Sequence, residues 1–270
     1  MDTDTLVITS CLQPASDVPF LSITDSNIRL KQLCCSILSW ASEPAIKKII
    51  LCDNSDPKYD FAPLREVLDQ HGKQSEVLLF EGSFAKVVSQ GKGYGEGEIM
   101  NYVFENSELI SSSDSFYKST GRLYIRNFDH LHQMHKQSRR VFENPISSGR
   151  RFAKKLAIVV NTLSRHGVGR VGTVFYKCDV PFFKGQLLER YYLVNDGQRF
   201  TLEHSYFQPL IRHGFSVFKD KPLIVGHSGT TGRLYHSDND YSSEINMQGI
   251  NLAKKILYSD VLSVSTSGLD

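Results

Sequence analysis

Long apolar runs are missing from this 270-residue sequence, since none approaches the roughly 20 residues needed to cross a bilayer. Its first residues, MDTDTLVITS, are acidic and pass straight into a β-rich run, unlike a secretory signal. Net charge is also small, +2 from 31 basic and 29 acidic residues, so no global field attracts nucleic acid or a membrane. We therefore expect a cytoplasmic protein, with docking at the inner face of the plasma membrane as a second possibility.

Metal-binding and disulfide patterns are missing as well. The five cysteines are an odd number without CxxC spacing, which favours free, mostly buried thiols in a reducing compartment. In DHLHQMH (129–135), His132 and His135 share a helical face, but His130 does not join them and no acidic partner follows at a useful interval. We expect no metal site there.

Two basic clusters stand out against the balanced charge: KQSRR (136–140) and GRRFAKK (149–155). The simpler interpretation is a solvated face. The alternative is an anionic partner, either a lipid headgroup or an acidic glycan, which would make 136–155 a peripheral membrane contact.

Strand and helix patterns alternate over the first 130 residues. Apolar, β-rich runs predict strands at 5–12, 45–57, 75–82 and 114–127. Helical spacing predicts helices at 27–40, 61–72 and 95–110. For the first helix, Ser26 is the predicted N-cap, and the spaced apolar residues are Ile28, Leu33, Ile37 and Trp40. This alternation predicts an α/β fold, a mostly parallel twisted sheet flanked by helices, with ligands at the carboxyl ends of the strands.

The second half changes character. We expect a basic amphipathic helix at 150–167, a strand, turn and helix over 170–187, a helix at 199–214, and a strand with a polar loop at 221–238. The predicted organisation is a single domain of two halves. Residues 1–130 form the nucleotide-binding half, and 131–270 form the acceptor-side half with a C-terminal helical tail.

Glycine-rich QGKGYGEGE (90–98) precedes a predicted helix, whose first N–H groups would face an anion. It matches neither the phosphate loop that ends in GK[ST] nor the GxGxxG fingerprint, so a flexible turn and a ligand loop both remain open. Glu96 and Glu98 would lie in the first helical turn, where carboxylates favour the helix dipole.

Other polar segments also have two interpretations. In CDNSD (52–56), Asp53 follows a parallel strand and would bind a ribose or base edge, or the segment is only an Asx-turn. In LEHSYF (202–207), Glu203 and His204 would point about 100° apart on a helix; one would face a cleft, or both are surface groups. The loop GHSGTTGRLY (226–235) offers a histidine, hydroxyls and glycines to a phosphate or sugar, or is merely a loop.

One predicted strand, SFYKSTGRLYIRN (115–127), carries Lys118, Arg122 and Arg126 around a Ser-Thr-Gly break. A glycine inside a strand marks a bulge or a place where a ligand approaches the backbone.

Taken in order, ITSCLQP, IRLKQLCCSILSW, IILCDNSD, GKGYGEGEIMNYVFENS, FYKSTGRLYIRN, LEHSYF and GHSGTTGRLY resemble bacterial cytosolic glycosyltransferases of the GT-A type found in capsule and lipopolysaccharide gene clusters. In that family a K-x-TGRY-like strand commonly follows a GKGxGE loop. The resemblance spans roughly residues 5 to 235, and its most specific parts are YKSTGRLY and GKGYGEGE. It implies a GT-A-like fold of the nucleotide-diphospho-sugar transferase kind.

The resemblance also implies a reaction. Members of the fold usually hold a divalent metal with Asp-x-Asp on a mid-domain strand, where this chain has KSTGR; the DND at 238–240 is misplaced for that role. Lys118 and Arg122 would instead neutralise the departing phosphate, so we expect metal-independent transfer to a hydroxyl of a glycan or lipid-linked glycan, without a cofactor. The missing motif mildly favours a CMP-sugar donor, and UDP- and GDP-sugars remain open.

Residue roles follow by position in the family. The predicted general base is Glu203, with Glu96 second and His204 third. The predicted donor-binding residues are Thr9, Ser10, Arg29, Asp53, Gly93, Lys118, Gly121, Arg122, His227 and Ser228. Two alternatives are a nucleotidyltransferase of sugar activation, although TSCLQPASD lacks the glycine- and lysine-rich loop expected there, and a non-catalytic nucleotide- or carbohydrate-binding module.

Overall fold

The computed structural model describes residues 4–14, 21–143, 169–229, 231–235 and 240–266, with side chains as far as 258. Within these residues, seven strands form one sheet in the order β3-β2-β1-β4-β7-β6-β8, and β5 and β9 form a second, two-stranded sheet. The predicted helix at 150–167 and most of the basic region 136–155 lie outside the described residues. None of the helices in the described part is long and apolar enough to span a membrane.

The first half of the sheet is parallel, as predicted. β1 (Thr5–Ser10) pairs in parallel with both β2 (Lys48–Asp53) and β4 (Ser115–Thr120), and β3 (Gln74–Leu79) pairs with β2. Every residue of β1 is buried, because a central parallel strand has both faces covered by helices.

The second half adds mainly antiparallel strands. β7 (Gly172–Asp179) runs antiparallel to β4, and β6 (Val141–Glu143) runs antiparallel to β7. β8 (Ser216–Val217) pairs in parallel with β6. The small sheet joins β5 (Tyr124–Ile125) to β9 (Ile224–Val225). β4 is therefore the strand where the parallel half meets the antiparallel half.

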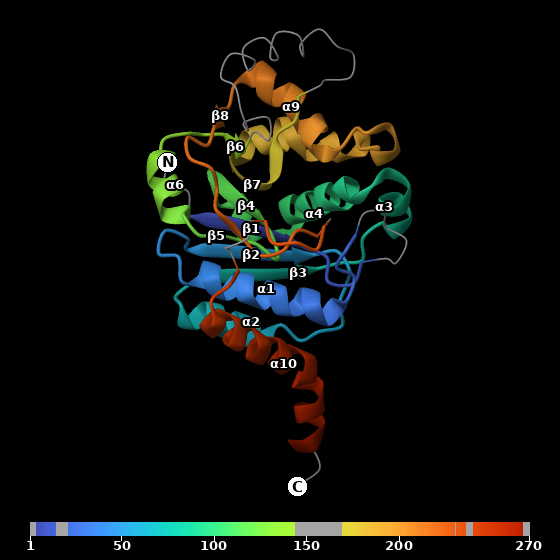
Figure 1. Ribbon diagram of the computed structural model, residues 1–270, viewed down its shortest axis with the longest axis vertical. Coiled ribbons are helices and arrows are strands. Elements are labelled where there is room, and N and C mark those ends of the chain that lie inside the picture. The colour runs from blue at the N-terminus through green and yellow to red at the C-terminus, as the bar shows by residue number, and fades with distance from the viewer. Residues whose placement is uncertain (1–3, 15–20, 144–168, 230, 236–239, 267–270) are drawn as a thin grey trace.

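Helices cover both faces of the sheet (Figure 1). One face carries α1 (Ser26–Ala41), α2 (Ala62–Gln70) and α10 (Ser243–Thr266). The other carries α3 (Phe84–Gln90), α4 (Lys92–Asn106) and α9 (Leu202–His213). Shorter elements are α5 (Glu108–Ser111), α6 (Phe128–Met134), α8 (Val180–Phe182), the π-helix η2 (Phe183–Leu187), and the 3₁₀ helices η3 (Leu188–Leu193) and η4 (Asp196–Gln198).

Apolar side chains form a cluster on each side of the sheet. On the α1 side, Trp40 is fully buried, and its ring forms T-shaped pairs with Tyr124 and Phe128, with centroids 5.0 and 5.1 Å away. Its Nε1 donates a hydrogen bond to the Leu123 carbonyl at 3.0 Å. This bond ties α1 to the turn after β4, which forms part of the candidate site.

Two details of α1 differ from prediction. The N-cap is Asp25, not Ser26: its carboxylate accepts hydrogen bonds from the backbone N–H groups of Asn27 and Ile28 at 2.8 and 2.9 Å. Ile28 is 49% exposed and lies off the buried face. The helix begins one residue earlier than its apolar pattern suggests, which makes Asp25 the N-cap. Ile28 is exposed because it lies on the opposite side of the helix from the buried Ile37.

Candidate functional site

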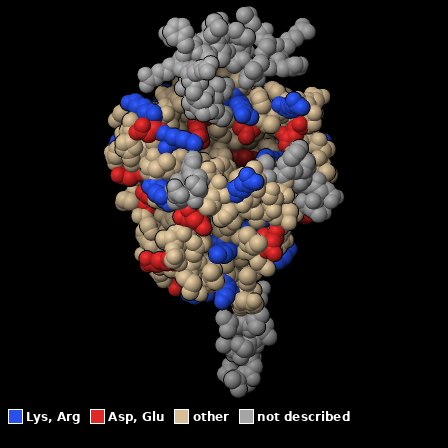
Figure 2. Space-filling view, viewed as in Figure 1, with Lys and Arg blue, Asp and Glu red and all other residues tan. Residues whose placement is uncertain are grey.

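A cavity of about 300 Å³ lies at the carboxyl ends of β1 and β4, the edge at which an α/β sheet places its ligands. Figure 2 shows this face of the molecule hollowed in its upper half, with acidic and basic side chains near the opening. Seven of the predicted site residues line the cavity: Thr9, Ser10, Arg29, Glu96, Gly121, Arg122 and Glu203. Six do not: Asp53, Gly93, Lys118, His204, His227 and Ser228.

Two guanidinium groups, those of Arg29 and Arg122, face the cavity although the residues are only 5% and 9% exposed. Arg29 donates from Nε to the Cys11 carbonyl and from Nη1 to the Ile23 carbonyl, both at 2.6 Å. In the part of the chain that the structure describes, Arg122 has one weak hydrogen-bond partner, Gln32 Oε1, at 3.5 Å from Nη1. Neither arginine pairs with a carboxylate among the described residues.

The charges of these arginines are costly because the side chains are buried. Burial, and then the neighbouring charge of Arg29, lowers the pKa of Arg122 to about 10. Burial also lowers the pKa of Arg29. Buried cations are normally paired with an anion. Two adjacent ones without a carboxylate therefore form a site suited to an anionic ligand, with guanidinium forks that match phosphate geometry.

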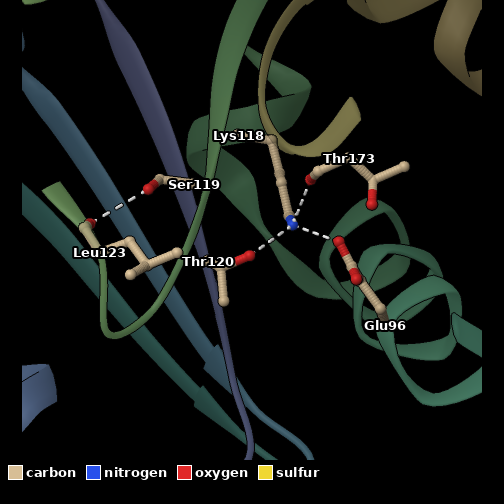
Figure 3. Close-up of polar contacts among 6 residues, drawn as sticks. All are labelled: Glu96, Lys118, Ser119, Thr120, Leu123 and Thr173. Atoms are coloured by element: carbon tan, nitrogen blue, oxygen red, sulfur yellow. Dashed lines mark hydrogen bonds and ion pairs between the residues drawn. The ribbon is translucent and has the colours of Figure 1, made fainter. Parts of the chain in front are cut away.

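Lys118 does not line the cavity, because its side chain is 0% exposed and its ammonium is already bound (Figure 3). It forms an ion pair with Glu96 and donates to Thr120 Oγ1 at 3.2 Å and to the Thr173 carbonyl at 2.8 Å. An ammonium has three hydrogens, and these three acceptors use them all. In this structure the ammonium of Lys118 therefore does not reach the cavity in which a departing phosphate would lie, contrary to the prediction.

Two carboxylates face the cavity, and they differ in their hydrogen-bond partners. Glu96, on α4, is fixed by Lys118 and its side chain is 27% exposed. Glu203, in the first turn of α9, is also at the wall, and its carboxylate forms no hydrogen bond or ion pair within the described part of the chain. Glu203 is therefore the carboxylate that remains available to accept a proton.

His204 does not join its neighbour Glu203 at the cavity wall. Its Nδ1 accepts a hydrogen bond from the Thr201 backbone N–H at 3.2 Å, which completes the capping box of α9. Burial lowers its pKa. The third-ranked base is thus a capping residue, because consecutive helical positions point in different directions.

Asp53 is fully buried and also lies outside the cavity lining. Its carboxylate accepts hydrogen bonds from the backbone N–H groups of Leu12 and Ser55, each at 2.9 Å, and from the Ser55 hydroxyl. It therefore holds the segment that follows β1 rather than a ribose. The next residue, Asn54, lines the cavity instead, and its buried Oδ1 accepts no hydrogen bond from the described residues.

The glycine-rich segment predicted as a loop is helical. Gly93, Gly95 and Gly97 lie inside α4, and only Gly91, just before it, has a positive φ (112°). A Cβ added at Gly97 would lie 2.0 Å from Tyr191 Cβ. The glycines therefore serve close packing of α4 against its neighbours; of the three in the helix, Gly95 lines the cavity.

The loop after β9 contributes through Gly229 and Tyr235 rather than through His227 and Ser228. A Cβ added at Gly229 would lie 2.3 Å from Arg122 Nη2, so the backbone of this loop packs directly on the guanidinium. Gly229 is the residue that allows this approach.

Of the histidines of 129–135, His132 and His135 are buried and His130 is exposed. No group of three or more His, Cys, Asp or Glu suited to a metal ion occurs among the described residues. His130 contacts Asp220 at 2.7 Å, His132 Nδ1 lies 3.1 Å from the Tyr117 hydroxyl, and His135 Nε2 accepts from Lys219 N–H at 3.1 Å. The DND motif at 238–240 lies mostly outside the described residues.

No protein-family model matches the chain, and a search of curated proteins found no match. Among solved structures, the glycosyltransferase GlyE of Streptococcus pneumoniae TIGR4 is 10% identical with a TM-score of 0.53, over 97% of this chain and 64% of GlyE. Its apo form gives a TM-score of 0.51 over the same shares of the two chains. The 4-diphosphocytidyl-2C-methyl-D-erythritol synthase of Anaerococcus prevotii is 10% identical with a TM-score of 0.42, over 94% of this chain and 96% of that one. The fold is GT-A-like. The chain spans about two thirds of the length of GlyE, and at this identity the likeness concerns the fold alone.

Proposed function

We propose that the protein is a glycosyltransferase that moves a sugar from a nucleotide-activated donor to a hydroxyl of a bacterial surface glycan, of the capsule or lipopolysaccharide type. The observation that carries the proposal is the pair of buried arginines, Arg29 and Arg122, which have no carboxylate partner within the described residues and face a cavity at the strand ends of a GT-A-like sheet. The family resemblance of YKSTGRLY and GKGYGEGE supplies the substrate class.

In the proposed reaction, Glu203 removes the proton from the acceptor hydroxyl as the oxygen attacks the anomeric carbon of the donor sugar. The bond between that carbon and the phosphate oxygen breaks, and the electron pair leaves with the nucleotide. Arg122 and Arg29 stabilise the negative charge that develops on the leaving phosphate. Because both guanidiniums are already in place, they need no reorganisation during the step.

We also propose that transfer requires no divalent metal, because the buried cations Arg29 and Arg122 face the cavity in which the donor would bind. The test is sugar transfer after dialysis against excess EDTA, with and without Mn²⁺ or Mg²⁺. Full activity in EDTA supports the proposal. A strict metal requirement would contradict the role assigned to the arginines.

The donor nucleotide is identified by thermal shift with CMP, UDP and GDP. A ligand at 100 times its dissociation constant stabilises the folded state by about 2.7 kcal/mol, which is easily detected. The wild type should then slowly hydrolyse nucleotide sugars carrying the selected nucleotide, even without an acceptor. If a bound nucleotide sugar stays intact with every acceptor, the protein is a binding module rather than a transferase.

The general base is tested with Glu203→Gln. Removing such a group typically slows the chemical step by about 10²–10⁴-fold, while donor affinity should stay near that of the wild type. Glu189→Gln, at an exposed carboxylate in η3, is the matched control and should keep full turnover. Near-wild-type turnover in Glu203→Gln with normal donor binding would remove Glu203 from the mechanism.

A further inference from the structure

The buried lysine Lys118 has no direct part in the proposed chemistry, yet three polar groups of the cavity wall converge on it (Figure 3). Its ammonium contacts the Glu96 carboxylate from α4, the Thr120 hydroxyl from β4 and the Thr173 carbonyl from β7. Glu96, Thr120 and Thr173 all line the cavity, and Lys118 itself does not. One buried cation thus joins the helix to the two strands that form one wall of the site.

Only one of the two oxygens of the Glu96 carboxylate takes part in this contact. Oε1 faces the Lys118 ammonium, whereas Oε2 forms no hydrogen bond or ion pair with the described residues. A carboxylate that serves only to neutralise a buried lysine need not reach a cavity. Here 27% of the Glu96 side chain is exposed, although the Lys118 side chain is fully covered.

The chemistry of Oε2 defines its ligand. An ionised carboxylate only accepts hydrogen bonds, and it repels a phosphate. The group it binds is therefore a hydrogen-bond donor, and a nucleotide sugar offers such donors as the hydroxyls of the sugar being transferred. The phosphate is left to Arg29 and Arg122.

We infer that Glu96 binds a hydroxyl group of the transferred sugar and that Lys118 is the positioning residue that fixes its carboxylate. This inference rests on the proposed function, because it requires a nucleotide sugar in the cavity. It replaces the predicted phosphate contact of Lys118 with an indirect role, and it gives Glu96 a role in sugar recognition instead of proton transfer.

The test compares the affinity for an intact nucleotide sugar with that for its free nucleotide. Calorimetric titrations without acceptor use UDP-glucose, UDP-galactose, GDP-mannose, CMP-N-acetylneuraminate and CMP-Kdo, each beside UDP, GDP or CMP. A hydrogen bond to a charged group corresponds to roughly 10- to 100-fold in affinity. We expect Glu96→Ala and Lys118→Met to weaken binding of the sugar conjugate within that range and to leave nucleotide binding unchanged.

A double variant separates positioning from independent contact. Because Lys118 acts through Glu96, Lys118→Met/Glu96→Ala should bind the conjugate no more weakly than Glu96→Ala alone. The matched control is Lys177→Met. Lys177 is a second buried lysine, and its ammonium donates to the carbonyls of His135 and Lys136, away from the cavity lining. Its replacement should leave the ratio of the two affinities at the wild-type value.

The outcomes are distinct. If the wild type binds none of the five conjugates more tightly than the free nucleotides, the inference is overturned; if it binds neither conjugates nor nucleotides, the proposed function falls with it. If the wild type binds a conjugate but Glu96→Ala weakens conjugate and nucleotide equally, or neither, the inference alone is overturned. Additive losses in the double variant remove Lys118 as a positioning residue. Should Lys118→Met fail to fold, Glu96→Ala and Glu96→Gln still decide the role of Glu96, and Lys118→Arg then tests positioning through the same affinity ratio.

Discussion

Arg122 should make the ligand-free protein less stable than it would be without the charge. Burial and the nearby Arg29 lower the pKa of Arg122 to about 10. Measured from its ordinary value near 12.5, this corresponds to about 3 kcal/mol of unfavourable free energy for the charged form, since one pKa unit is about 1.4 kcal/mol. The side chain has only the weak Gln32 contact to offset that cost within the described residues.

The variant Arg122→Met keeps most of the aliphatic stem and removes the charge. We expect its free energy of unfolding, measured by urea denaturation without ligand, to rise by about 1–3 kcal/mol, because lost packing offsets part of the gain. In domains of about 150–250 residues, each kcal/mol of stabilisation raises the melting temperature by roughly 2–4 °C. The melting temperature of this slightly longer chain should rise by a similar or slightly smaller amount per kcal/mol. The same variant should bind the cognate nucleotide roughly 10- to 100-fold more weakly, because a charge-assisted hydrogen bond is lost.

The matched control is Arg126→Met, at an exposed arginine four positions later in the chain. Substitutions at such positions usually change stability by no more than about 0.5 kcal/mol, and nucleotide binding should not change. The reasoning is refuted if ligand-free Arg122→Met is less stable than the Arg126→Met control, or if it binds the nucleotide as tightly as the wild type.

Three further predictions concern packing and protonation. Gly97→Ala should lower the free energy of unfolding by about 1–3 kcal/mol through overpacking against Tyr191, whose Cβ lies 2.0 Å from the added methyl position; an unchanged urea midpoint would contradict this. Burial lowers the pKa values of His135 and His204. Below about pH 6.5 the unfolded chain therefore binds more protons than the folded one, and the free energy of unfolding should fall from pH 7 to pH 5. His135→Gln should make this fall less steep, and a pH dependence parallel to that of the wild type would contradict the argument. Burial raises the pKa of Cys11 to about 12 and also raises those of the other four thiols; a thiol reagent at pH 8 should therefore react slowly with native protein and rapidly with all five thiols in guanidinium, and one fast native thiol would contradict the burial argument.

Much of the parallel half of the fold was predictable, because its signals are local. The run TLVITS predicts β1 from β-rich, apolar residues, and the structure buries all six of them. Helical spacing likewise located α1 and α4, and the turn residues after β2 marked the correct edge of the sheet. Each of these patterns lies within a few residues of the element that it specifies.

The site was less predictable, because long-range contacts decide what each polar residue does. From the sequence, Asp53 is predicted to bind a ligand. In the structure its Oδ2 instead accepts a hydrogen bond from the backbone N–H of Leu12, 41 positions away. From the sequence, Lys118 is predicted to bind phosphate. In the structure its ammonium instead donates to the carbonyl of Thr173, 55 positions away, and to the carboxylate of Glu96. The neighbouring Asn54 reaches the cavity, and its place in CDNSD was the only signal that could have suggested it.

The hydrogen bonds of the other buried cations support the proposal that Arg122 contacts a ligand. Among the described residues, three lysines are buried, and each ammonium donates hydrogen bonds to oxygen atoms of the protein. Lys73 donates to the carbonyls of Glu43 and Ile46, and Lys177 donates to the carbonyls of His135 and Lys136. Lys118 donates to its three partners in the cavity wall. The fold thus provides each of these buried ammonium groups with acceptors from the protein itself. Within the same described residues, the Arg122 guanidinium donates one hydrogen bond, of 3.5 Å, and it lies at the cavity. Because an unsatisfied buried cation is costly, its persistence at this one wall is best explained by a ligand that supplies the missing negative charge.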